Sequence, residues 1–200
     1  MKSILILYPI QPYADALVDK EELPEVKIRY AEIYQELIRK RYPDFQMICM
    51  MFSAPEDLAK PDISQLWKGF SVNGDDIIGA CGVTFEDHCK KRIYPKEEKI
   101  LDLCPQPMEE LVVTGFHLWD CVDKVTKYAY NQDINVLVDE DLTELFFFST
   151  WGSRGFPVFK IPVSREESLR RTGRQLRKAG GFFLEDARKE RKKRPWMAQI

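Results

Sequence analysis

The sequence is poor in the residues that build metal and nucleotide sites. It holds only two histidines, and its five cysteines form no Cys-x-x-Cys pair of the kind common in structural zinc sites. A glycine-rich phosphate loop is missing as well. The sequence therefore predicts a protein without a cofactor and without a bound metal ion.

Long hydrophobic runs and targeting signals are also missing. No stretch of about 18 apolar residues could cross a bilayer, and no apolar segment with a small-residue cleavage site marks a signal peptide. The cysteines are scattered and odd in number, which favours a reducing compartment. These absences predict a cytoplasmic protein with no membrane partner.

The chain is long and apolar enough for one substantial core. Its 200 residues are 44% hydrophobic and 31% charged. Short apolar runs, typical of buried strands, alternate with helical patterns. We expect strands before Pro9 and at residues 45–52, 77–85, 111–113 and 134–138, and helices at residues 25–41 and after residue 120. This alternation predicts a three-layer α/β/α fold with a mainly parallel, Rossmann-like sheet.

Residues 111–142 read as strand, sharp turn, helix and strand, with one cysteine at the turn. Asp120 is the expected N-cap of the helix, with Asp123 three residues on. Cys121 then lies at the carboxyl end of a strand and in the first turn of a helix. Ligands of α/β folds bind at such strand ends, so we expect a small-molecule ligand near Cys121. The alternative is a buried structural cysteine.

This segment resembles the nucleophile-bearing unit of the isochorismatase-like cysteine hydrolases, which include nicotinamidases and N-carbamoylsarcosine amidases. In that family a Cys-Val pair follows a glycine by six residues, and an alanine follows the cysteine by eight. Gly115, Cys121, Val122 and Ala129 have these spacings. The Glu140-Asp141 pair stands at the acidic end of the family's next strand. The resemblance covers about 30 residues, is weaker upstream, and does not continue beyond residue 142.

The resemblance implies a catalytic triad of aspartate, lysine and cysteine, whose thiolate attacks an amide or related carbonyl carbon. It also implies a cis peptide at residues 116–117, with backbone amides near Cys121 holding the oxyanion. Two of the three catalytic groups are not where the family has them. Pro9 stands in the aspartate's place, and the lysine's strand end carries Ala80, Cys81 and Gly82.

A free thiol needs a nearby base to become a nucleophile. Lys90 and Lys91, the nearest amines, lie in a charged segment expected to face solvent. His117 or His88 could replace the lysine, and the prediction is Cys121 as nucleophile with His117 as base. The alternative for His117 is a histidine satisfied in a turn. The chain is then either a cysteine hydrolase of amide or carbamoyl compounds with altered chemistry, or a pseudoenzyme.

The sequence changes character after residue 142. The aromatic stretch at residues 145–163 is typical of a last strand, a glycine turn and a further strand or edge segment. It also suits a subunit interface, so we expect a homo-oligomer. Residues 165–194 hold 12 Lys and Arg against 5 Asp and Glu, a balance of +7, while the whole chain is −2. We therefore divide the chain into an α/β domain at residues 1–164 and a basic helical arm at residues 165–200. The arm suits an anionic partner such as nucleic acid in a non-catalytic binding protein. The alternatives are a solvated tail, or an arm that docks on the acidic body of a neighbouring subunit.

Overall fold

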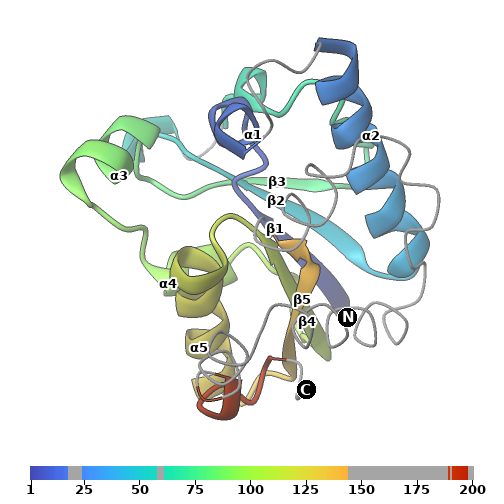
Figure 1. The fold of residues 1–200 in the computed structure, drawn as a ribbon. Helices are drawn as coiled ribbons and strands as arrows, with labels where there is room; N and C mark the ends of the chain where they lie inside the picture. The colour runs from blue at the N-terminus through green and yellow to red at the C-terminus, as the bar shows by residue number, and fades with distance from the viewer. Residues whose placement is uncertain (18–23, 58–60, 144–188, 190, 198–200) are drawn as a thin grey trace.

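The sheet forms the middle layer of the molecule (Figure 1). The computed structural model describes residues 1–17, 24–57, 61–143, 189 and 191–197. Within them, five strands pair in parallel in the order β3-β2-β1-β4-β5. The strands are β1 (Lys2–Leu7), β2 (Gln46–Met51), β3 (Ile77–Ala80), β4 (Glu110–Gly115) and β5 (Val136–Thr143). The predicted α/β class with a parallel sheet is confirmed.

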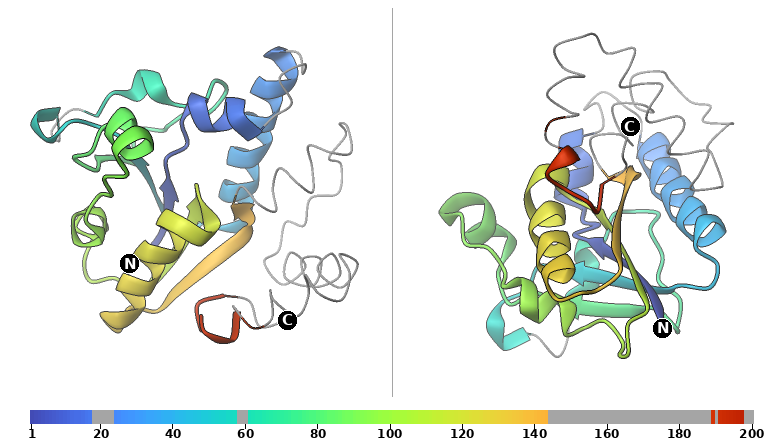
Figure 2. Two further views of the ribbon diagram at one scale, coloured as in Figure 1. Left: turned by 60° about the vertical axis from the view of Figure 1, so that its left-hand side comes forward. Right: turned by 90° about the horizontal axis from the view of Figure 1, so that it is seen from below.

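Helices cover both faces of this sheet. Figure 2 shows α2 (Pro24–Arg41) on one face and α5 (Asp123–Asn131) on the other. The shorter helices are α1 (Gln11–Leu17), α3 (Phe85–Lys91) and α4 (Glu97–Leu101), with 3-10 turns at Pro55–Asp57 and Ile63–Gln65. Because both faces are covered, the central strands are apolar over most of their length. Residues 4–7 of β1 are at most 1% exposed.

Two element boundaries differ from the sequence prediction. β3 ends at Ala80 instead of reaching Phe85, because the Thr84 hydroxyl accepts a hydrogen bond from the Asp87 amide (3.1 Å) and starts α3 there. Asp120 is not the N-cap of the following helix. It lies inside a π-helical turn, Leu118–Val122, which begins after His117 and leads directly into α5.

The acidic end of β5 is the third difference. The last strand is expected to end at residue 138, but Asp139 and Glu140 also lie within it and are 2% exposed. Arg41 Nη1 contacts the two carboxylate oxygens of Asp139 at 3.1 and 2.9 Å, and the Tyr42 hydroxyl donates to the same carboxylate at 2.6 Å. Arg191 pairs with Glu140. The strand can continue because each buried carboxylate has a cationic partner.

The described end of the C-terminal arm docks on the body of the same chain. The Val138 amide donates to the Trp196 carbonyl oxygen (3.0 Å), and Arg194 Nε lies 2.8 Å from Asp123 Oδ1. Two of the arm's charges, on Arg191 and Arg194, are thus used in ion pairs with β5 and α5. The predicted domain boundary at residue 164 and the aromatic stretch lie outside the described residues, so the oligomer and the arm's anionic partner stay predictions. Among the described helices, none is long and apolar enough to span a bilayer.

Removing one member of a buried ion pair leaves the other charge unpaired, and this costs about 3–5 kcal/mol. We expect Asp139→Asn to lower the free energy of unfolding by about that amount, as measured by urea denaturation. Glu36→Gln is the matched control. It removes the exposed pair of Glu36 with Lys40 (2.5 Å) and should change stability by less than about 0.5 kcal/mol. Equal effects of the two variants would contradict the structural role of Asp139.

Candidate functional site

The approach of β4 to β1 determines where Cys121 lies. Gly115, the last residue of β4, has φ +104°, and a Cβ there would lie 2.2 Å from the Leu7 carbonyl oxygen. Only glycine fits this contact. The next peptide bond, Phe116-His117, is cis, as the family resemblance implies. The π-helical turn that follows carries Cys121 at the carboxyl edge of the sheet.

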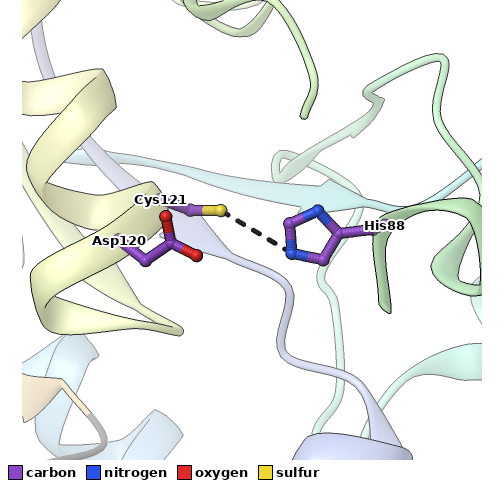
Figure 3. A group of neighbouring side chains, drawn as sticks. All are labelled: His88, Asp120 and Cys121. Atoms are coloured by element: carbon purple, nitrogen blue, oxygen red, sulfur yellow. Dashed lines mark hydrogen bonds between the residues drawn. The ribbon is translucent and has the colours of Figure 1, made fainter. Parts of the chain in front are cut away.

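The thiol of Cys121 faces the imidazole of His88 (Figure 3). Sγ lies 4.0 Å from His88 Nε2, and both residues are buried. His88 Nδ1 is 3.0 Å from the Ile93 carbonyl oxygen, which can only accept a hydrogen bond. The proton of a neutral His88 ring is therefore on Nδ1, and the lone pair of Nε2 is directed toward the thiol.

Asp120 belongs to a second group of contacts beside the thiol. Its Oδ1 lies 2.6 Å from Lys124 Nζ, and the Tyr94 hydroxyl donates to Oδ2 at 3.1 Å. Lys124 Nζ also lies 3.1 Å from the centre of the Tyr94 ring. These contacts fix the carboxylate next to Cys121.

The surroundings of the thiol favour its neutral form. The pKa of Cys121 is raised to about 12, mainly by burial and also by the Asp120 carboxylate, while the Lys124 ammonium acts in the opposite direction. Asp123, two residues after Cys121, has other partners: it pairs with Arg194 and accepts a hydrogen bond from the Trp196 indole (3.2 Å).

A small pocket opens beside the thiol; its roughly 180 Å³ of space between atoms includes space that is open to solvent. Its lining residues are Tyr8, Tyr94, Pro95, Glu97, Ile100, Cys121, Lys124 and Val125. The Tyr8 side chain is 0% exposed and stacks on Phe52, with ring centres 4.0 Å apart. Only a small substrate group could approach Cys121 through this pocket.

The ends of β1 and β3 carry neither an acid nor an amine. The pocket residue at the end of β1 is Tyr8, while the Pro9 carbonyl accepts from the Trp67 amide (2.9 Å). Cys81 follows β3, and its thiol donates to the Val83 carbonyl at 3.3 Å. Burial raises the pKa of Cys81, and the Tyr8 hydroxyl acts in the opposite direction.

The amines near the thiol differ from those singled out in the sequence. Lys90 and Lys91 pair with Glu86 and Asp87 on the solvent face of α3, as expected for solvated side chains. Lys124 is the amine that lines the pocket, and the sequence reading missed it. The signal was available, because Lys124 follows Asp120 by four residues, a spacing that brings side chains together on a helix.

The two histidines proposed as bases have different neighbours. His88 lies at hydrogen-bonding distance from Cys121, whereas the ring of His117 packs edge-on against Tyr13, with ring centres 4.7 Å apart. No described contact tests the predicted role of His117 as base, so it stays a prediction. His88, Asp120 and Cys121 also offer nitrogen, oxygen and sulfur atoms within 4.8 Å of one another, which is close enough to bind a metal ion.

Solved structures of isochorismatase-family proteins are similar to this chain, each at 16% sequence identity. An isochorismatase from Pseudomonas putida has a TM-score of 0.42, with 71% of this chain and 70% of that chain covered. An isochorismatase-like hydrolase from Alkaliphilus metalliredigens has a TM-score of 0.42, with 72% of this chain and 81% of that chain covered. The YcaC gene product of Escherichia coli is described as an octameric hydrolase of unknown specificity. Its TM-score is 0.43, with 76% of this chain and 70% of that chain covered. No family model and no curated protein sequence matches the chain. These structures belong to the same family that residues 111–142 resemble.

A thiol whose pKa is about 12 is almost entirely protonated at neutral pH. We therefore expect iodoacetamide at pH 7–8 to alkylate the exposed Cys89 well before Cys121, as followed by peptide mass spectrometry. Asp120→Asn removes a charge that raises the pKa, so it should speed the alkylation of Cys121 several-fold and leave Cys89 unchanged. Alkylation of wild-type Cys121 ahead of Cys89 would contradict this description of the site.

Proposed function

We propose that the protein is a cysteine hydrolase that cleaves a C–N bond, of the amide or carbamoyl type, in a small molecule other than a peptide. Cys121 is the nucleophile and His88 is its base. The observation that carries the proposal is the contact between Cys121 Sγ and His88 Nε2 at 4.0 Å, with Nδ1 held by the Ile93 carbonyl. A nucleophile, a base and a third group that orients the base are the parts that such catalysis requires.

In this mechanism the thiol need not be ionised at rest. His88 Nε2 accepts the thiol proton while Sγ bonds to the carbonyl carbon of the substrate. The same proton passes to the leaving nitrogen as the C–N bond breaks, which yields a thioester and a free amine or ammonia. Water then attacks the thioester with His88 again as base, and the carboxylic or carbamic acid and the thiol are released. A raised resting pKa of Cys121 is compatible with this order of events.

The backbone amide of Cys121 is the donor that we assign to the oxyanion. The amides of Asp120 and Val122 each donate to the His117 carbonyl at 3.1 Å and are engaged there. Lys124 lines the same pocket and carries a positive charge close to the developing oxyanion. In this proposal His117 is part of the turn, and His88 carries out the proton transfer.

A non-catalytic ligand-binding protein is the second candidate. Two features of the site favour it: the thiol is protonated at rest, and the strand ends carry Tyr8 and Cys81 instead of an acid and an amine. In that case the small pocket still binds a ligand, but the ligand leaves unchanged.

Acyl transfer to Cys121 distinguishes these two functions. We expect p-nitrophenyl acetate to acetylate Cys121 in the native protein, detected as an acetyl mass on its peptide, with release of p-nitrophenol. His88→Asn should slow this step by about 10²–10⁴-fold, because the general base is lost. His117→Asn should cost far less.

Cys89→Ser is the control for reaction at an exposed thiol and should leave the acetylation of Cys121 unchanged. Circular dichroism of each variant establishes that the fold is intact. Equal losses in the two histidine variants would refute His88 as the base. Absence of the acetyl group from Cys121 in the wild type would refute the hydrolase and favour the ligand-binding protein.

A further inference from the structure

The side chains of His88, Asp120 and Cys121 form a buried or half-buried group of three different metal ligands (Figure 3). Their nitrogen, oxygen and sulfur atoms lie within 4.8 Å of one another, with sulfur and nitrogen 4.0 Å apart. Bonds of about 2.0–2.3 Å around a tetrahedral zinc ion bring ligand atoms to roughly 3.3–3.6 Å from each other. Small side-chain rotations would therefore close the three atoms around one ion.

Two of the three ligands are already held by outer partners, as ligands in metal sites usually are. His88 donates from Nδ1 to the Ile93 carbonyl, so Nε2 is the nitrogen directed toward the site. Each oxygen of Asp120 has a partner, in Lys124 or Tyr94. A carboxylate offers about four lone-pair positions, so these contacts still leave Asp120 able to coordinate.

Tyr8 provides an independent observation in the same pocket. Its side chain is fully buried, and its hydroxyl has no hydrogen-bond partner of normal geometry among the described residues. The Cys81 thiol is nevertheless close enough for this hydroxyl to lower the pKa of Cys81. Buried hydroxyls without such a bond are uncommon and costly. Tyr8 and Cys121 line the same pocket, so a water molecule at the fourth position of a metal ion could bond to this hydroxyl.

The chemistry of the ligands selects the class of ion. Sulfur and imidazole nitrogen favour zinc and similar transition-metal dications, whereas calcium and magnesium prefer oxygen ligands. Binding replaces the thiol proton: the Cys121 S–H bond breaks, a sulfur–metal bond forms, and the proton passes to solvent. Three protein ligands plus water match an open zinc site more closely than a closed structural site.

We infer that His88, Asp120 and Cys121 bind a zinc-type dication, which caps the thiol and the imidazole and so switches the site off reversibly. The switching effect rests on the proposed hydrolase function, because it requires Cys121 and His88 to be the catalytic pair. The binding itself does not depend on that function.

Cobalt(II) is the probe for binding, because its bond to a thiolate gives a near-ultraviolet charge-transfer band and tetrahedral coordination gives strong visible bands. We expect the full-length protein, first treated with a chelator, to bind one equivalent of Co²⁺ with these bands and to lose them on addition of Zn²⁺. Cys121→Ser should abolish the charge-transfer band, and Cys89→Ser should retain it. His88→Asn should weaken binding more than tenfold, and Tyr8→Phe by about tenfold, as for an outer-shell partner.

Protection of the wild-type protein gives a second measurement that needs no variant. Zn²⁺ should slow the alkylation of Cys121 by N-ethylmaleimide and leave Cys89 unaffected. The site is refuted if cobalt gives no thiolate band, if the band survives Cys121→Ser, or if zinc fails to protect Cys121. Cobalt binding without acetylation of Cys121 would retain the metal site and refute the switch. Acetylation without cobalt binding would refute both the metal site and the switch and leave the proposed hydrolase function in place.

Discussion

The hydrogen bond from His88 Nδ1 to the Ile93 carbonyl is the interaction on which the site depends. It fixes the tautomer, and so determines that a lone pair and not a proton faces Cys121. The end of α3 makes this bond possible, because Arg92 adopts φ 58° there and turns the chain so that the Ile93 carbonyl reaches back to the ring. Both the proposed proton transfer and the proposed metal site use the Nε2 lone pair that results.

The aromatic packing at the strand ends explains why the remaining chemistry is confined to a small space. Tyr8 and Phe52 stack where β1 and β2 end, and Tyr13 packs against Phe52 and Phe116. Large rings thus fill the edge of the sheet where a parallel α/β fold usually binds its ligand. The same packing removes water from Cys121 and raises its pKa, so the thiol depends on a neighbouring base or ion to lose its proton.

Charged residues serve two separate purposes on the two sides of β4. Asp120 and Lys124, the charged residues beside Cys121, are half-buried, and Lys124 lines the pocket. The pairs of Arg41 with Asp139 and Arg191 with Glu140 are almost completely buried and join α2 and the C-terminal segment to β5. The acidic residues of β5 therefore stabilise the fold, although the sequence pattern predicted that the strand ends before them, at residue 138.

The sequence by itself determined the strands, the layers and the position of Cys121, because apolar patterns directly record which residues are buried on a sheet. The family resemblance added Gly115 and the cis peptide, both local properties of the chain. Only the tertiary structure decided that His88 lies at hydrogen-bonding distance from the thiol. That contact joins residues 33 apart in the chain, and it depends on how α3 packs beside the π-helical turn. Periodicity carries no information on such pairings, since they are set by packing between distant segments.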